Sequence, residues 1–150
     1  MNTHELEEKA AKLIANFDGV FARDYLPSRK KRNRSFIMNS DTSNLPGKHW
    51  IAVIVRNNVG YCFDPLGFPP SPTLSSWLNR HYSIWSSNAN RRVQPLYSEL
   101  CGYYCLFFLS WSSSGFVSTV DYNTILDILF PSNKSILEYE KSIKMFRNSF

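Results

Sequence analysis

The stretch that decides the fold is HWIAVIV, His49–Val55, followed by YCFD, Tyr61–Asp64. The first segment is rich in β-branched residues and is apolar on both of its alternating faces, which predicts a strand buried on two sides. The residues between the segments, RNNVG at 56–60, are typical of a tight turn, and Pro65 and Gly67 end the second segment. We therefore expect an antiparallel hairpin at the centre of a sheet.

The register of this hairpin brings two titratable side chains near each other. A turn at 56–58 pairs residues whose numbers sum to about 113 to 115. This pairing sets His49 opposite Asp64 or within two residues of it. An imidazole and a carboxylate are therefore expected to meet at one end of the hairpin.

A second segment, LCGYYCLFFLSW at Leu100–Trp111, is apolar nearly all round. This pattern predicts a helix buried inside the domain, because a helix on the surface has one polar face. Ser98 is expected to cap the helix, so that it begins near Glu99 and carries Cys101 in its first turn.

The remaining elements complete an α+β fold, with a central mixed or antiparallel sheet flanked by helices. Helices are predicted over four further ranges, 4–17, 74–85, 121–130 and 134–147. Thr3 is expected to cap the first of them. Short strands are predicted at 36–38 and 91–96, and a polar loop at 39–47.

The composition excludes several classes of protein. With 150 residues, 43% of them apolar and 15% aromatic, the chain supports a sizeable core and one domain, residues 1–150. The longest apolar run, 100–111, is shorter than the roughly 20 residues that a membrane-spanning helix needs, so no membrane partner is expected. The acidic N-terminus does not read as a secretory signal, and the three cysteines are odd in number and lack zinc-ligand spacing. We therefore expect an intracellular, reducing location and no metal.

Four residues, Cys101, His49, Asp64 and Gln94, are of the types that a thiol-based catalytic site requires. Cys101 is placed at a helix N-terminus, where a neighbouring imidazolium would stabilise its thiolate. Of the three histidines, His49 opens the central strand and has Asp64 across the hairpin to orient it. Gln94, seven residues before Cys101, could donate its amide to a tetrahedral intermediate, and Gly102 leaves room for a substrate carbonyl.

Each of these residues also has a purely structural interpretation. A cysteine in such an apolar helix is commonly an inert core residue, which is the interpretation we keep for Cys62 and Cys105. A histidine on a strand is commonly a satisfied core residue, and an aspartate before proline commonly forms a turn. The joint pattern in one chain is what favours chemistry.

Basic residues are concentrated in two short segments, although the net charge is only +5. They are Arg29, Lys30, Lys31, Arg32 and Arg34 in the first segment, and Arg91 and Arg92 in the second. Such residues could contact the phosphates of a polyanion without reading its sequence. A solvated loop and a localisation signal are alternative interpretations.

Four strings carry a resemblance to a known family: GVFARDYLP at 19–27, GKHW at 47–50, YCFDPLGFPP at 61–70 and QPLYSELCGYYC at 94–105. They resemble the adenovirus protease family (adenain), cysteine endopeptidases of the larger group that includes the ubiquitin-like-protein proteases. The order of histidine, acid, glutamine and cysteine matches as well, and it is the reverse of papain-type enzymes. The resemblance covers about residues 18–112 and implies a papain-like-superfamily domain of the adenain type, with the catalytic cysteine at the N-terminus of the buried helix.

The resemblance also implies a role for each residue of the combination. Cys101 would be the nucleophile, His49 the general base and acid, and Asp64 the orienting acid. Gln94 would share the oxyanion with the backbone N–H of Cys101. Adenain has Glu where this chain has Asp64, and Asp is the common choice in the ubiquitin-like-protein proteases, so the mechanism is unaffected. No cofactor would be required for the chemistry.

By the same resemblance, the chain would be a viral endopeptidase that cleaves virion structural precursor proteins during maturation. It would act as a monomer in the virion and in the host nucleus or cytoplasm. Adenain is activated by DNA and by a peptide tethered through a disulfide; residues 83–93 hold no cysteine here, which leaves DNA or a noncovalently bound peptide as activators. Two alternatives stay open: a protease that removes ubiquitin or ubiquitin-like modifiers, and a non-catalytic nucleic-acid-binding or capsid-associated protein.

Overall fold

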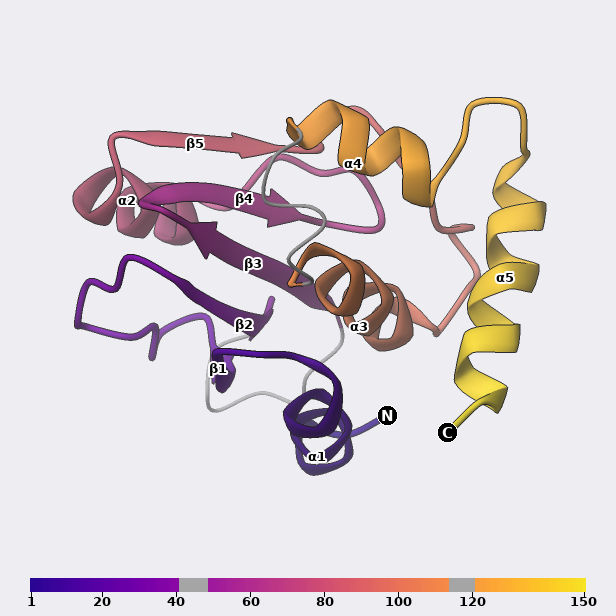
Figure 1. Ribbon diagram of the computed structural model, residues 1–150, viewed down its shortest axis with the longest axis horizontal. Helices are drawn as coiled ribbons and strands as arrows, with labels where there is room; N and C mark the ends of the chain where they lie inside the picture. Colours follow the sequence, from indigo (N-terminus) through magenta and orange to yellow (C-terminus); the bar gives the residue numbers. More distant parts are fainter. Residues whose placement is uncertain (41–48, 114–120) are drawn as a thin grey trace.

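A mixed five-stranded sheet runs through the described part of the protein, residues 1–40, 49–113 and 121–150 of a computed structural model (Figure 1). Its strands are β1 (Phe17–Ala22), β2 (Arg34–Asn39), β3 (Trp50–Arg56), β4 (Val59–Phe63) and β5 (Ile84–Ser87). They lie side by side in chain order, with the two outer pairs parallel and the two pairs around β3 antiparallel. β3 is therefore the central strand, as its two apolar faces predict.

The register of the β3–β4 hairpin is confirmed. Ala52 pairs with Phe63 and Ile54 pairs with Tyr61, so the paired numbers sum to 115. His49 directly precedes β3 and Asp64 directly follows β4. Both residues therefore lie at the open end of the hairpin, away from its turn.

Helices cover both faces of the sheet in the described ranges. They are α1 (Thr3–Leu13), α2 (Pro72–His81), α3 (Cys101–Ser112), α4 (Tyr122–Leu129) and α5 (Ile136–Asn148). Trp50, Ala52 and Ile54 of β3 pack in one core cluster with α1, α3, α4 and α5, whereas Ile51, Val53 and Val55 pack in a second cluster with α2. This alternation explains why β3 carries apolar residues on both faces.

α3 is the buried helix that the sequence predicts. It lies against β3 and is flanked by α1 and α5 (Figure 1). Its buried residues occupy most of its circumference, which is why an amphipathic pattern is absent. None of the helices in the described residues is both long and apolar enough to cross a membrane.

The N-terminal helix is shorter than its apolar spacing predicts. α1 ends at Leu13 rather than at residue 17, and Asn2 rather than Thr3 caps it by accepting a hydrogen bond from the Glu5 N–H at 2.9 Å. Asn16 adopts a left-handed φ of 57°, which turns the chain so that Phe17 begins β1. The pairing of β1 with β2 therefore overrides the helical pattern.

The segment before α3 also differs from expectation. The predicted strand at 91–96 is wrong, because Val93 and Gln94 instead donate their backbone N–H groups to the Pro65 carbonyl as part of a loop. The predicted helix 74–85 ends at His81, since residues 84–87 pair with β4 as β5. Residues 84–87 are too few to carry a sequence pattern that would predict parallel pairing with a neighbouring strand.

Smaller differences concern element ends. The strand predicted at 36–38 extends over all of β2, while the two C-terminal helices match α4 and α5 within two residues. α3 begins at Cys101 with Leu100 as its N-cap, and Ser98 accepts a hydrogen bond from the Leu100 N–H instead of capping the helix. Most of the loop predicted at 39–47 lies outside the described residues.

Candidate active site

An imidazole and a carboxylate meet at the open end of the β3–β4 hairpin. His49 Nε2 lies 2.7 Å from Asp64 Oδ1. The backbone holds His49 in place, because its carbonyl accepts a hydrogen bond from the Ser40 N–H at 2.9 Å, next to the β2–β3 pairing. Since a carboxylate can only accept, Nε2 carries the proton of a neutral ring and Nδ1 is the nitrogen left for another partner.

Asp64 is fixed by four further hydrogen bonds, one of which its carbonyl accepts from the Gly67 N–H at 2.8 Å. The side chain of Asn88 accepts from the Asp64 N–H at 2.8 Å and donates to the Asp64 carbonyl at 2.6 Å. Asp64 Oδ1 also accepts from the Leu66 N–H at 2.8 Å, which closes the turn before Gly67. The carboxylate therefore forms the turn expected of an aspartate before proline while it also holds the histidine.

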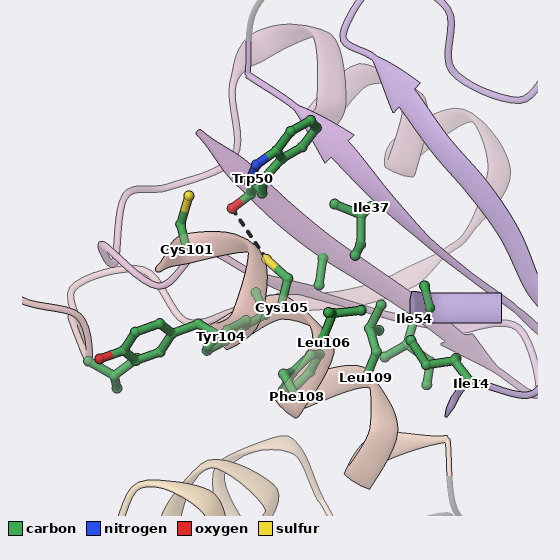
Figure 2. Packing of buried hydrophobic residues seen from close by; sticks show 14 of the residues in the cluster. Ile14, Ile37, Trp50, Ile54, Cys101, Tyr104, Cys105, Leu106, Phe108 and Leu109 are labelled. Atoms are coloured by element: carbon green, nitrogen blue, oxygen red, sulfur yellow. Dashed lines mark hydrogen bonds between the residues drawn. The ribbon is translucent and has the colours of Figure 1, made fainter. Parts of the chain in front are cut away.

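Cys101 opens α3 beside this pair. Gly102 and Cys105 anchor the first turns of α3 on Trp50, with the Cys105 thiol donating to the Trp50 carbonyl at 3.3 Å. Figure 2 shows that the Cys105 sulfur points to that carbonyl, whereas the Cys101 sulfur points away from the packed cluster. A Cβ on Gly102 would lie 3.3 Å from Trp50 Cδ1, so the glycine permits this close packing.

Asp64 and Cys101 both affect the pKa of His49. Burial disfavours the charged imidazolium, but hydrogen bonds with Asp64 and Cys101, together with the charges on both, raise the pKa of His49 from 6.5 to about 9. The ring is therefore protonated at neutral pH when both partners carry negative charge. The structure brings Cys101, His49 and Asp64 together although they come from three elements.

The other two cysteines are chemically different from Cys101. Burial, with a smaller effect of the Asp64 charge, raises the pKa of Cys62, and burial likewise raises the pKa of Cys105. Both thiols stay protonated at neutral pH and are poor nucleophiles. Their interpretation as core residues agrees with their complete burial in the two apolar clusters.

Gln94 lies in the loop between β5 and α3 and is almost fully buried. Its Nε2 donates to the Ser98 carbonyl at 2.8 Å. Its Oε1 is buried and has no hydrogen-bond partner among the residues that the structure describes. The bond to Ser98 therefore sets the orientation of the amide, and it uses one of the two Nε2 protons.

A cavity of about 350 Å³ opens beside His49 and Asp64. Its lining is mainly apolar, with Met38, Ile51, Leu66 and Phe68 around it, and Arg23 supplies a positive charge. Phe68 is 58% exposed, so its ring is accessible to a ligand in the cavity. An extended peptide could place an apolar side chain there.

The basic segments are partly used inside the fold. Arg34 is only 3% exposed and binds Asp18 at 2.7 Å, so it does not present its charge to a polyanion. Lys31 binds the same carboxylate at 2.8 Å, and Arg91 binds Asp127 at 2.8 Å. The remaining members of the two segments are Arg29, Lys30, Arg32 and Arg92, all exposed.

Three residues near the site were missed in the sequence: Asn88, Ser98 and Glu140. Glu140 carried a usable signal, because it lies four residues after Ile136 and three before Ile143, on the apolar face of α5. A charged residue on an apolar stripe is expected to have a buried partner. Asn88 lies in irregular chain and had no such signal, and the sequence predicts Ser98 only as a helix cap and not as a partner of Glu140. Across the described ranges, no group of side chains could hold a metal ion.

Comparison with known proteins finds one similar viral protease sequence and a shared protease fold. No family model matches the chain. A protein named Protease from Porcine adenovirus A serotype 3 is 26% identical over 133 residues, which cover 77% of this chain and 65% of that protein. A crystal structure of the ASFV pS273R protease, 22% identical, superposes with a TM-score of 0.51 over 74% of this chain and 42% of its own.

These findings confirm the resemblance to an adenovirus protease and the α+β protease fold. The chain spans less than two thirds of the adenovirus relative and less than half of the solved protease.

Proposed function

We propose that this chain is a cysteine endopeptidase that uses Cys101, His49 and Asp64. The observation that carries the proposal is the position of the His49 ring, which Asp64 holds at 2.7 Å directly before β3, where Gly102 and Cys105 pack the first turns of α3 against Trp50. The sequence similarity to an adenovirus protease and the shared protease fold support it.

The geometry suits acyl transfer through a thioester. The Cys101 thiolate, stabilised by the His49 imidazolium and by the free N–H groups at the start of α3, would attack the scissile carbonyl. His49 would give its proton to the leaving amine, which frees the C-terminal product and leaves an acyl-enzyme. The neutral ring would then remove a proton from water, and the hydroxide so formed would release the second product and restore the thiolate.

The negative charge on the tetrahedral intermediate needs fixed donors. The backbone N–H of Cys101 begins α3, where the first N–H groups have no partner within the helix. The second Nε2 proton of Gln94 is the side-chain donor that we assign to the same oxygen. Asp64 would keep the ring in the tautomer that accepts the thiol proton.

The substrates we propose are precursors of viral structural proteins, cleaved during virion maturation. The viral source of the similar sequence supports this class. The cavity beside His49 would take an apolar side chain of such a substrate, and the nearby Arg23 would favour an acidic neighbour.

The proposal is tested by labelling the protein with a peptidyl vinyl sulfone that ends in Gly-Gly and locating the modified residue by mass spectrometry. We expect modification of Cys101 and none of Cys62 or Cys105, because both of those thiols stay protonated. Cys101→Ser should abolish labelling, while Cys105→Ser serves as the matched control on the same helix. Labelling of another cysteine, or of none, would contradict the proposal.

The pH dependence of labelling tests the ion pair. In the proposed mechanism His49 takes up the thiol proton, and without such a partner an ordinary thiol with a pKa near 8.5 is about 99% protonated at pH 6.5. His49→Ala should therefore lower the labelling rate at pH 6.5 by roughly 10- to 100-fold. Turnover should fall as pH rises through about 9, because His49 then loses the proton that the leaving amine requires. Equal labelling rates of the wild type and His49→Ala at pH 6.5 would exclude the pair.

A further inference from the structure

A buried carboxylate lies behind the loop that carries Gln94. Glu140 of α5 is only 5% exposed, and its Oε1 accepts hydrogen bonds from Ser98 Oγ and from Tyr104 OH, each at 2.9 Å. No lysine, arginine or histidine among the described residues forms an ion pair with it. A buried carboxylate is costly to keep without a cation, so these two hydroxyl donors are what hold it there.

Ser98 connects this carboxylate to the start of α3 and to Gln94. Its hydroxyl gives its one proton to Glu140, which turns the oxygen lone pairs toward the Leu100 N–H at 3.2 Å. Its carbonyl accepts from Gln94 Nε2 at 2.8 Å. Because Gln94 Oε1 has no partner in the described residues, the amide is oriented through Ser98 alone.

α5 has several anchors besides Glu140. The helix already has a complete capping box between Ser135 and Glu138, a fully buried Ile143 in the core and the Tyr139 hydroxyl on the Pro131 carbonyl at 2.6 Å. Both partners of Glu140 instead lie on either side of Cys101 in the chain, at 98 and 104.

We infer that Glu140 is a positioning residue for the oxyanion donors, acting through Ser98 on the Gln94 amide and on the backbone that leads into Cys101. This inference rests on the proposed function. A carboxylate accepts a stronger hydrogen bond than a neutral group does, so it fixes the Ser98 hydroxyl and with it the path of 98–100. Glu140 touches neither substrate nor the thiol.

The test separates chemistry that forms an oxyanion from chemistry that does not. Alkylation of Cys101 by iodoacetamide proceeds without an oxyanion and depends on the thiolate, whereas peptide hydrolysis and binding of a Gly-Gly peptide aldehyde both place negative charge on oxygen. We compare wild type, Glu140→Gln and Glu138→Gln. The last is the matched control, because it removes a charge from the same helix while its amide oxygen can still accept from the Ser135 N–H.

Glu140→Gln should lower kcat and aldehyde affinity by about 10-fold each, less than the 10²- to 10³-fold typical of losing an oxyanion donor outright. Its KM and its rate of alkylation should match those of the wild type, and Glu138→Gln should be unchanged in all four. In a Ser98→Ala background, Glu140→Gln should have little additional effect on kcat and aldehyde affinity, because both substitutions interrupt the same chain of hydrogen bonds.

Three outcomes overturn the inference or its premise. Parallel losses of alkylation, hydrolysis and thermal stability in Glu140→Gln would mean a merely structural role, and unchanged hydrolysis would mean that Glu140 has no influence on the donors. The proposed function is tested by the wild type alone. It would be overturned if the wild-type chain neither hydrolysed the peptide nor bound the aldehyde.

Discussion

The candidate site has two halves that are held in different ways. We call His49 and Asp64 the strand-borne half, and Gln94 with the backbone before Cys101 the loop-borne half. His49 and Asp64 stand at the ends of paired strands, where the β2–β3 and β3–β4 hydrogen bonds set their positions. Gln94 and the backbone before Cys101 stand in a loop, where a few backbone bonds to Pro65 and single side-chain bonds such as that from Gln94 to Ser98 set the geometry. One half thus has redundant backbone support, and the other depends on a few polar contacts.

This difference has a consequence for mutation. Substitutions in the strand-borne half should remove chemistry while leaving the position of the neighbouring groups intact, because the ladder of backbone bonds remains. Substitutions in the loop-borne half remove a donor and can also shift the chain around it. Activity and stability, measured together, therefore distinguish the two halves.

The largest effect is expected from Asp64→Asn in the strand-borne half. The Asn amide would donate to His49 Nε2 and drive the ring to the tautomer with its proton on Nδ1, facing Cys101, so the ring could no longer accept the thiol proton. We expect kcat to fall by roughly 10³- to 10⁴-fold, as for comparable triads.

Stability provides the control for Asp64→Asn. His49 and the Leu66 N–H both contact Asp64 Oδ1, so an amide nitrogen in that position leaves the Leu66 N–H without its acceptor, and the free energy of unfolding should fall by only about 1 to 3 kcal/mol. A variant that keeps a third or more of wild-type kcat would show that Asp64 serves only the turn.

A smaller effect is expected from Gln94→Ala in the loop-borne half. Loss of the amide removes one oxyanion donor, and kcat should fall by about 10²-fold with little change in KM. Gln94→Glu should be worse than Gln94→Ala, because a carboxylate would repel both the oxyanion and the Ser98 carbonyl.

Alkylation with iodoacetamide distinguishes the two halves in these variants. It should be unaffected by Gln94→Ala, whereas His49→Ala should slow it at neutral pH. Equal slowing by both substitutions would mean that Gln94 supports the thiolate and not the oxyanion.

The same division explains what the sequence could predict. The β-branched run at His49–Val55 predicts a strand, the turn after it determines a register, and the register predicts that His49 meets Asp64. The all-apolar pattern of Leu100–Trp111 likewise predicts the buried helix and the place of Cys101 near its start. These positions can be predicted because they lie in or next to regular elements, where each residue fixes the position of the next.

No local sequence pattern predicts the residue positions in the loop-borne half. The strand predicted at 91–96 is wrong because the chain there bonds to Pro65, a contact that no local pattern reveals. The contact between Ser98 and Glu140 depends on the packing of α5 beside α3, because the two residues are 42 positions apart in the chain. Long-range polar contacts of this kind follow from tertiary structure and not from periodicity.

Asn88 joins the two halves, and its loss should give the smallest effect on activity. Its side chain satisfies both backbone groups of Asp64 and also donates to the Arg91 carbonyl at 3.2 Å. Asn88→Ala leaves the buried Asp64 N–H without its partner, which should lower the free energy of unfolding by about 1 to 3 kcal/mol.

The effect of Asn88→Ala on turnover decides how independent the halves are. If the strand ladder alone positions Asp64, kcat should fall no more than about threefold while the urea midpoint drops, because the His49 contact survives. The matched control is Ser87→Ala, at the residue directly before Asn88. It removes only the hydrogen bond that Ser87 Oγ accepts from the Ala89 N–H at 3.3 Å. A 100-fold loss of kcat in Asn88→Ala with an unchanged urea midpoint would contradict this expectation. It would show that the loop, and not the sheet, positions the Asp64 carboxylate.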